Sequence, residues 1–263
     1  METANGKAGT DPRPVGVFDS GAGGISVLKE IRRQLPGEDL VFFGDDLNAP
    51  YGTKPQEQIR ALAENAVKVL LSYGSKAVVI ACNTATAAAA EELRARYRFP
   101  IIGMEPAIKP ASAVRKDGIV LSMATPGTLG SEKYQRLYER YGDGVISIPC
   151  PGLMEFVERE ELDSPALHAC LQGFFEPYRD RKVDAVVLGC THYVFLRKAI
   201  RACFGEETVL IDGNEGTARQ LKRRLEQEGL LAPAGRTGET KIHSSGGQVF
   251  VDRLTRLYRM PEE

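Results

Sequence analysis

The sequence lacks long hydrophobic runs, an excess of charge of one sign and closely spaced cysteines. No apolar segment approaches the roughly 18 residues of a membrane-spanning helix, and the first residues contain no hydrophobic signal-peptide core. The formal net charge is −1 with acidic and basic residues interspersed, so there is no basic patch for nucleic acid and no charged face for a membrane. These absences predict a cytoplasmic protein that binds neither nucleic acid nor membranes.

The cysteines are odd in number and far apart, at positions 82, 150, 170, 190 and 203. No pair has the Cys-x-x-Cys or Cys/His spacing of a zinc site, and a chain without an export signal keeps its thiols reduced. We therefore expect neither a disulfide framework nor a structural metal. A free cysteine is most often a small buried hydrophobe, which is our interpretation of Cys150, Cys170 and Cys203.

Short apolar runs alternate with longer amphipathic segments from Val15 onward. This alternation predicts right-handed crossover units and mainly parallel sheets that are covered on both faces. Strands are expected at Val15–Phe18, Leu40–Phe43, Ala77–Ala81, Ile101–Met104, Ile119–Met123, Val145–Ile148, Ala185–Leu188, Val209–Ile211 and Lys241–His243. Helices are expected between them, among others at Ile25–Leu35, Gln56–Tyr73, Thr84–Arg98 and from about Val249.

The strand pattern restarts after a proline-containing stretch at Glu105-Pro106, which we take as a domain boundary. A second crossing is expected near Asp212-Gly213-Asn214, so that the C-terminal segment returns to the first domain. We predict a disordered lead-in over residues 1–14, a first α/β domain of residues 15–105 plus 215–263, and a second over residues 106–214. The functional cleft would lie between these two similar doubly wound domains.

Two segments echo each other, Val78–Thr84 and Val186–His192. Each is an apolar run that ends on a cysteine, Cys82 or Cys190, with a threonine within two residues. The helical stretch after Cys82 presents spare N–H groups that favour a thiolate, and Cys190 is expected to repeat this situation. Two thiols at matching strand ends suggest two halves that face one another across a cleft. Racemisation, which needs a base on each face of a flat intermediate, would use this arrangement.

Three further loops carry polar groups just past strand ends, where open parallel sheets gather functional residues. Phe18–Gly24 is a glycine-rich turn that offers N–H groups to an anion, but it lacks the G-x-G-x-x-G order of a dinucleotide site. The loops Gly44–Gly52 and Met123–Thr128 hold further groups for a carboxylate. Taken singly, each loop is also explained as a tight turn or a helix cap.

Taken together, these segments resemble the cofactor-independent glutamate racemases of the aspartate/glutamate racemase superfamily. The resemblance implies two α/β domains related by a pseudo-twofold, with glutamate buried between them. It implies an isomerase that needs no pyridoxal phosphate, interconverts L- and D-glutamate by 1,1-proton transfer and supplies D-glutamate for peptidoglycan. The motifs that match, in the family's order, are FDSGAGG at Phe18–Gly24, GD…PYG at Gly44–Gly52, VIACNTATA at Val79–Ala87, ATPGT at Ala124–Thr128, CPGL…VE at Cys150–Glu158 and LGCTHY at Leu188–Tyr193.

The resemblance also implies roles for individual residues. Cys82 and Cys190 would be the catalytic acid/bases, assisted by Asp19, Glu158 and His192, which would set thiol protonation near neutral pH. Asp45 matches a further acid of the motif. The residues implied to hold the substrate are Asp19, Ser20, Pro50, Tyr51, Gly52, Asn83, Thr84, Thr125, Thr128, Thr191 and His192. No cofactor and no metal are implied, and homodimers are common in the family.

Two other classes of function remain open from the residues. One is a racemase of the same superfamily that acts on aspartate or a hydantoin, or a maleate-type isomerase, because pocket size alone shifts the preference. A non-catalytic protein that binds a small acid would carry the same loops, with both cysteines as structural residues.

Overall fold

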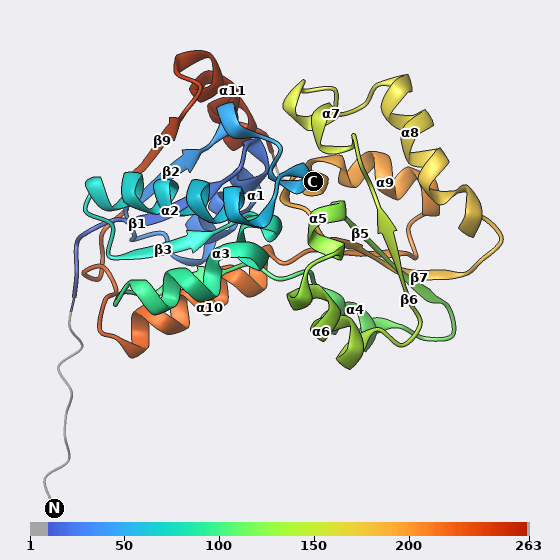
Figure 1. Cartoon of the computed structure of the whole chain (residues 1–263), viewed down its shortest axis with the longest axis horizontal. Coiled ribbons are helices and arrows are strands. Elements are labelled where there is room, and N and C mark those ends of the chain that lie inside the picture. The colour runs from blue at the N-terminus through green and yellow to red at the C-terminus, as the bar shows by residue number, and fades with distance from the viewer. Residues whose placement is uncertain (1–9, 262–263) are drawn as a thin grey trace, which may run out of the picture.

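Two parallel sheets organise the computed structural model, which describes residues 10–261 of the chain (Figure 1). The first sheet has the order β4-β3-β1-β2-β9 and the second the order β6-β5-β7-β8, and every pairing is parallel. The strands are β1 (Val15–Asp19), β2 (Leu40–Gly44), β3 (Ala77–Ile80), β4 (Ile101–Gly103), β5 (Ile119–Ala124), β6 (Val145–Pro149), β7 (Val183–Leu188), β8 (Val209–Ile211) and β9 (Thr240–Ser244). The predicted class of two mainly parallel α/β domains is confirmed.

The two sheets share one topology. β1 lies between β3 and β2 with β4 outside β3, and β5 lies between β7 and β6 with β8 outside β7. The backbone repeats the match, because the Ala81 N–H donates to the Phe18 carbonyl at 2.8 Å and the Gly189 N–H donates to the Met123 carbonyl at 2.8 Å. The cysteine after β3 and the cysteine after β7 therefore occupy equivalent places in the two sheets.

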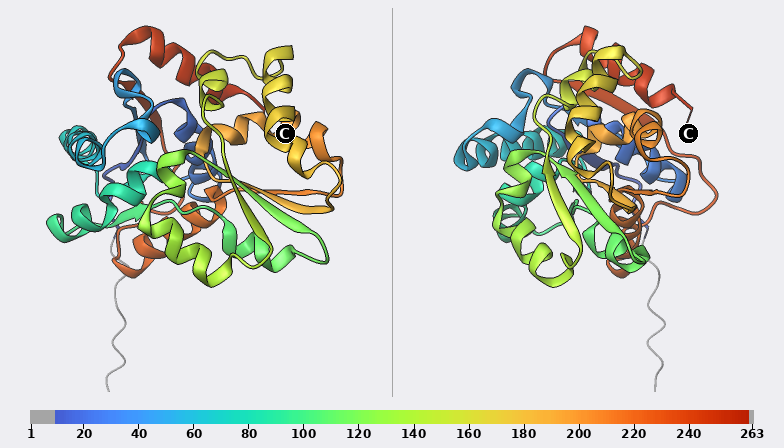
Figure 2. Two further views of the ribbon diagram at one scale, coloured as in Figure 1. Left: turned by 45° about the vertical axis from the view of Figure 1, so that its right-hand side comes forward. Right: turned by 90° about the vertical axis from the view of Figure 1, so that its right-hand side faces the viewer.

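Each sheet is covered by helices on both faces, as the two further views show (Figure 2). The helices associated with the first sheet are α1 (Ile25–Gln34), α2 (Gln56–Ser72), α3 (Asn83–Arg96), α10 (Asn214–Gln227) and α11 (Gln248–Arg259). Those associated with the second are α4 (Ile108–Val114), α5 (Pro126–Leu129), α6 (Glu132–Tyr141), α7 (Met154–Glu158), α8 (Pro165–Phe175) and α9 (Arg197–Phe204). Single turns of 3-10 helix occur at η1 (Ala22–Gly24), η2 (Asp46–Asn48), η3 (Tyr51–Thr53) and η4 (Glu176–Tyr178), and a longer one at η5 (Thr191–Leu196).

The side chains of alternate residues in the central strands pack into hydrophobic cores on opposite faces of the sheet. In β3, Val79 packs with α1, α10 and α11, whereas Val78 and Ile80 pack with α2 and α3. In β5, Leu121 belongs to the core with α7, α8 and α9, and Val120 to the core with α4 and α6. Strands buried on both faces read as continuous apolar runs, which is why the sequence predicts them well. All nine expected strands are present, with ends that differ by at most two residues.

The chain termini of the described region join the first sheet. β9 pairs with β2, so the C-terminal segment lies in the first sheet. Part of the expected disordered lead-in, residues 1–9, lies outside the described residues. Residues 11–14 differ from that expectation, because the Asp11 N–H donates to the Leu231 carbonyl and Lys76 Nζ donates to the Asp11 carbonyl at 2.6 Å. The domain boundaries stay a prediction.

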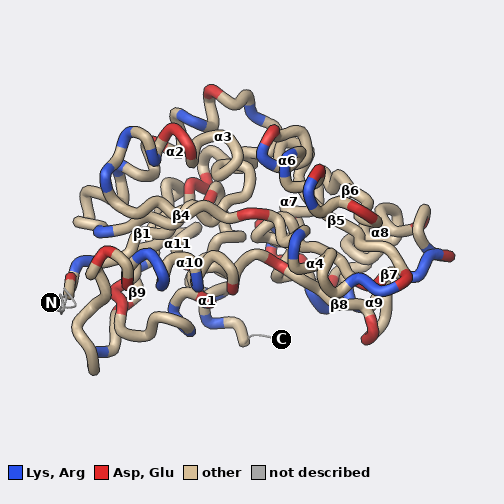
Figure 3. The backbone as a smooth tube through the Cα atoms, turned by 90° about the horizontal axis from the view of Figure 1, so that it is seen from below, with Lys and Arg blue, Asp and Glu red and all other residues tan. Residues whose placement is uncertain are grey.

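Charged residues of both signs are interspersed along the chain in the view from below (Figure 3). This agrees with the net charge of −1. Within residues 10–261, no helix has the length and apolar character to cross a membrane.

Candidate active site

Cys82 lies at the carboxyl end of β3 and forms the N-cap of α3. Its Sγ accepts the Ala85 N–H at 3.4 Å and lies 3.5 Å from Ser20 Oγ. Both donors favour the thiolate, and the Ala85 N–H is the kind of donor that the sequence predicts at the helix N-terminus. Burial opposes them, and with the nearby Asp19 carboxylate it raises the pKa of Cys82 to about 12. The expectation of a thiol pKa near neutral is therefore wrong for Cys82 in this structure, because loss of water outweighs the helix N-terminus.

Asp19 ends β1 and is completely buried. It accepts the Gly21 N–H at 3.0 Å and the Thr191 hydroxyl at 3.0 Å. Ser20 Oγ, 3.4 Å from Asp19 Oδ1, bridges this carboxylate to Cys82. Burial raises the pKa of Asp19 to about 6, although the His192 imidazole and these hydrogen bonds lower it.

Cys190 follows β7, but its surroundings differ from those of Cys82. The segment after it, η5, is a 3-10 helix, and the Cys190 side chain caps no N–H. The residues THYVFL of η5 are mostly β-branched or aromatic, and such residues form α-helices poorly. The partner of the Cys190 sulfur is instead His192, whose Nδ1 lies 3.6 Å away.

His192 connects Cys190 to Glu158. The His192 Nε2 lies 2.7 Å from Glu158 Oε1, which also accepts the Ala22 N–H at 2.9 Å. Burial disfavours the imidazolium, but the Cys190 sulfur and the Glu158 carboxylate outweigh it and raise the pKa of His192 well above its usual value. Burial likewise opposes the charge on Glu158, yet its partners, with His192 first, lower the pKa of Glu158 to about 2.

Three buried threonine hydroxyls meet between the two sheets. Thr84 of α3 lies 3.1 Å from Thr125 and 3.2 Å from Thr128, and the last two lie 3.0 Å apart. Thr125 also caps α5, since its Oγ1 accepts the Thr128 N–H. Next to this cluster, Asn83 Nδ2 contacts the Met104 sulfur, while Asn83 Oδ1 is buried with no hydrogen-bond partner. These groups can supply hydrogen bonds to a small polar ligand.

The loop after β2 reaches the same place. Tyr51 is buried, and its hydroxyl donates to Asp45 Oδ2 at 2.6 Å. Burial, together with the Asp45 carboxylate, raises the pKa of Tyr51. Gly52 packs so closely on Thr125 that an added Cβ would lie 3.1 Å from the threonine Cβ.

These residues surround one narrow cleft of about 280 Å³ of empty space between the two sheets. A larger hollow, about 1770 Å³, opens at the amino end of the second sheet and touches none of the predicted site residues. Asp19, Pro50 and Glu158 do not line the cleft; Asp19 and Glu158 contact the lining residues from behind. The cleft is lined by Ser20, Tyr51, Gly52, Cys82, Asn83, Thr84, Thr125, Thr128, Met154, Gly189, Cys190, Thr191 and His192.

The family model described as Asp/Glu/Hydantoin racemase matches residues 15–221, more than half of the chain. The chain belongs to this racemase family. A glutamate racemase of Clostridium perfringens is 46% identical over 235 residues, which are 88% of this chain and 90% of the relative.

Solved structures of the family agree in fold. The glutamate racemase isoform RacE1 of Bacillus anthracis has a TM-score of 0.83 and 32% identity, with 93% of each chain covered. The Escherichia coli glutamate racemase, in complex with L-glutamate and the activator UDP-MurNAc-Ala, has a TM-score of 0.81 and 30% identity, with 94% of this chain and 96% of that chain covered.

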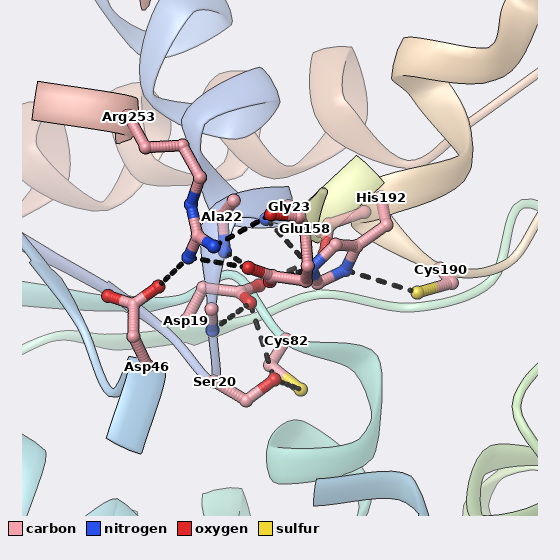
Figure 4. A network of polar contacts seen from close by, with 12 residues as sticks. Asp19, Ser20, Ala22, Gly23, Asp46, Cys82, Glu158, Cys190, His192 and Arg253 are labelled. Atoms are coloured by element: carbon pink, nitrogen blue, oxygen red, sulfur yellow. Dashed lines mark hydrogen bonds and ion pairs between the residues drawn. The ribbon is translucent and has the colours of Figure 1, made fainter. Parts of the chain in front are cut away.

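This racemase places further residues at its site that the sequence reasoning missed. Met154 and Gly189 line the cleft, and each lies inside a motif that the sequence analysis singled out. Behind the His192–Glu158 pair lies Arg253, which Figure 4 shows pointing toward the Glu158 carboxylate, and Asp46 contacts Arg253 in turn. Asp46 adjoins a predicted motif residue, whereas Arg253 lies in an amphipathic helix far along the chain with no local signal. Within residues 10–261 of this racemase, no group of three or more His, Cys, Asp and Glu side chains is arranged to hold a metal ion.

Proposed function

We propose that the chain is a glutamate racemase that interconverts L- and D-glutamate by direct 1,1-proton transfer at the α-carbon. The observation that carries the proposal is the pair Cys82 and Cys190. These cysteines follow equivalent strands of two sheets with one topology and line one buried cleft. Inverting a stereocentre through a planar carbanion needs one acid/base on each face, and two facing strand ends provide it.

In the proposed cycle, one thiolate removes the α-proton while the opposite thiol delivers a proton to the other face. The family resemblance assigns Cys82 to deprotonation of D-glutamate and Cys190 to deprotonation of L-glutamate. Ser20 and the Ala85 N–H stabilise the Cys82 thiolate. His192 Nδ1 serves Cys190, since a protonated ring stabilises its thiolate and a neutral nitrogen can accept the thiol hydrogen.

The α-proton of an amino acid is far less acidic than a thiol, so the site must reduce the difference between the two pKa values. Burial raises the pKa of Cys82 to about 12, which makes its thiolate a stronger base once it forms. On the substrate side, hydrogen bonds aimed at the α-carboxylate stabilise the negative charge that develops there. The Thr84, Thr125 and Thr128 hydroxyls are placed for this task.

Recognition of both ends of glutamate is assigned to groups on both sheets. The hydroxyl cluster and the N–H groups near Gly52 suit carboxylates, and the unpartnered Asn83 Oδ1 suits an ammonium. Asp19, which lies behind the cleft wall against Ser20 and Thr191, adds negative charge next to these lining residues. The E. coli relative in complex with L-glutamate supports this choice of substrate.

The proposal includes several finer expectations drawn from the family. The enzyme supplies D-glutamate for peptidoglycan, works in the cytoplasm without pyridoxal phosphate, and forms a homodimer. Size-exclusion chromatography with light scattering tests the last of these. A mass of one chain, 28.7 kDa, would contradict the dimer without touching the reaction.

Circular dichroism with each pure enantiomer of glutamate, without pyridoxal phosphate or metal, tests the proposed activity. We expect the optical signal to decay from both enantiomers to the same endpoint. Activity only with aspartate or a hydantoin would favour the related racemases. Ligand binding without any turnover would favour the non-catalytic binding protein.

Substitution of the two thiols tests their assignment. Cys82→Ser and Cys190→Ser should each lower the racemisation rate at least about 100-fold, since a positioned acid/base contributes 10²–10⁴-fold. Cys170→Ser is the matched control, because Cys170 lies in α8, outside the cleft. Its activity should stay within about twofold of the wild type. Full activity in either cleft variant would contradict the two-base assignment.

A further inference from the structure

Arg253 of α11 lies behind the proposed Cys190 side of the site and grips Glu158 with two nitrogens. Its Nη2 lies 2.5 Å from Glu158 Oε2, and its Nη1 donates to the Glu158 main-chain carbonyl at 2.8 Å. The same Nη2 lies 2.6 Å from Asp46 Oδ1, and Asp46 in turn accepts the Ser244 hydroxyl at 2.5 Å. The Arg253 side chain is only 13% exposed, so water screens these contacts weakly.

The contacts continue from Arg253 to the Cys190 sulfur in a short chain (Figure 4). Arg253 takes one oxygen of Glu158, which leaves the other, Oε1, 2.7 Å from His192 Nε2. The opposite ring nitrogen, His192 Nδ1, lies 3.6 Å from Cys190 Sγ. Glu158 and the Gly23 N–H thus contact one ring nitrogen of His192, and the other ring nitrogen faces the thiol.

The contacts of Glu158 with Arg253 and Ala22 connect elements that pack on different sheets. Glu158 ends α7, which packs with the second sheet, whereas Arg253 and Ala22 belong to elements of the first. The carboxylate is thus oriented from the other side of the cleft, by one guanidinium and one N–H. A guanidinium suits this task because its planar fork fixes direction, which a lysine ammonium does not.

We propose that Arg253 is a positioning residue of the racemase, which holds Glu158 against His192 and thereby controls the acid/base function of Cys190 but not that of Cys82. This inference rests on the proposed function. The charged and titratable groups that face Glu158 and His192 are Arg253 from α11, Asp46 from η2, Asp19 from β1 and Cys190 after β7.

The contacts of Arg253 with Glu158 give the proposal a direction in pH. Arg253 is among the partners that lower the pKa of Glu158, after His192 and the Ala22 N–H. Loss of the positive charge alone would favour the His192 cation. Once Glu158 Oε1 is no longer held against His192 Nε2, however, the hydrogen bond that raises the pKa of His192 is lost, so this pKa falls. The alkaline limb of the pH–rate profile, where it reflects loss of the His192 proton, should then move to lower pH.

Three variants on one helix test the proposal by steady-state kinetics against pH. Arg253→Gln should lower kcat about 10–100-fold, leave KM within about threefold and move the alkaline limb to lower pH. Arg253→Lys keeps the charge but lacks the fork, so it should show a smaller shift of the limb than Arg253→Gln and lose 3–10-fold in kcat. Arg256→Ala is the matched control, since Arg256 makes an exposed ion pair with Glu160 across the same boundary at 2.5 Å. Its kcat should stay within about twofold of the wild type.

A second readout needs no turnover. The rate of alkylation of each cysteine by iodoacetamide, followed by mass spectrometry of its peptide, reports thiolate formation at that residue. In Arg253→Gln, alkylation of Cys190 at pH 7 should slow at least about threefold, while that of Cys82 should not change. The wild-type protein distinguishes failure of the proposed function from failure of the Arg253 proposal. If the wild type does not racemise glutamate, the proposed function is wrong, but the alkylation rates still test the effect of Arg253 on Cys190.

Several outcomes overturn the inference. One is an alkaline limb and a Cys190 alkylation rate that do not change in Arg253→Gln. Another is an equal slowing of the alkylation of Cys82 and Cys190 in that variant. The third is a loss of kcat in Arg256→Ala as large as that in Arg253→Gln. If Arg253→Gln does not fold, Arg253→Lys decides, and wild-type kcat in that variant would contradict positioning by the guanidinium fork.

Discussion

The two cysteines of the cleft occupy equivalent strand ends, yet their immediate partners differ in kind. Cys82 has a hydroxyl and a backbone N–H as donors, with the Asp19 carboxylate one contact further away. Cys190 has an imidazole that is itself held by a carboxylate. In the proposed reaction, the two faces of the substrate would thus meet bases with different partners, although the reaction is symmetric.

Ionisation of a single residue, Asp19, makes the stability of the folded protein depend on pH. Its pKa is raised from 3.8 to about 6 by burial, so between these values the folded protein keeps a proton that the unfolded chain loses. The stability contributed by the protonated carboxyl is present at low pH and is lost as the pH rises toward 6. Asp19→Asn cannot ionise, so its melting temperature relative to the wild type should rise from pH 4 to about pH 6 and then level off.

Thermal unfolding of both proteins across this pH range measures the effect. Taking the difference cancels the titration of all carboxyls that the two proteins share. A constant difference from pH 4 to pH 8 would show that Asp19 ionises in the folded protein as it does in the unfolded chain. The variant should also lose racemase activity, because Asp19 supports the groups around Cys82.

At the scale of elements, the site depends on the close approach of η1 to η5. Gly23 has no side chain, and an added Cβ would lie 2.4 Å from His192 Nδ1 and 2.6 Å from the His192 backbone nitrogen. Gly23→Ala must push η5 away or turn the imidazole that serves Cys190. Since a misplacement of about 1 Å can cost 100-fold in rate, we expect kcat/KM to fall by about that factor in a racemase assay.

Gly216→Ala is the control for this change. An added Cβ there meets no heavy atom within 4 Å, and Gly216 lies in the first turn of α10. The substitution should leave activity unchanged and stabilise the protein by up to about 1 kcal/mol, as alanine forms helix more readily than glycine. Wild-type activity in Gly23→Ala would mean that the contact of η1 with η5 does not position His192.

The elements themselves could largely be predicted from the sequence. Val78 and Val79 face opposite cores, so their strand carries an unbroken apolar signal. The loops that hold Cys82 and Thr125 could be found because strand ends and turn residues mark them. Arg253 could not, because its helix shows only an amphipathic pattern and its partner Glu158 lies 95 residues away in the chain. The raised pKa of Cys82 was also missed, since burial depends on the packing of both sheets.

At the scale of the whole molecule, a buried ion pair fastens the N-terminal end of the described chain and the segment that follows α10 to the first sheet. Lys76 Nζ lies 2.6 Å from Glu38 Oε2 and 2.6 Å from the Asp11 carbonyl. Glu38 Oε1 accepts the Ala232 N–H at 2.7 Å. The side chains of Lys76 and Glu38 are 0% and 2% exposed. Removing one partner leaves an uncompensated buried charge.

Lys76→Met should therefore lower the free energy of unfolding by about 3–5 kcal/mol, measured by urea denaturation. The folded fraction should racemise glutamate at the wild-type rate, because the pair does not line the cleft. Lys182→Met is the control, since Lys182 is 57% exposed and its ion pairs should contribute no more than about 1 kcal/mol. Equal losses in the two variants would contradict the role of the buried pair.

In the proposed reaction, two thiols act on opposite faces of the α-carbon of glutamate. Racemisation of each pure enantiomer in D₂O, with the deuterium content of both enantiomers followed by mass spectrometry at early times, tests it most directly. We expect the product to carry solvent deuterium while the remaining substrate keeps its α-proton, from either direction. Deuterium that enters the remaining substrate as fast as the product would instead indicate a single base, and would contradict the proposed pairing of Cys82 with Cys190.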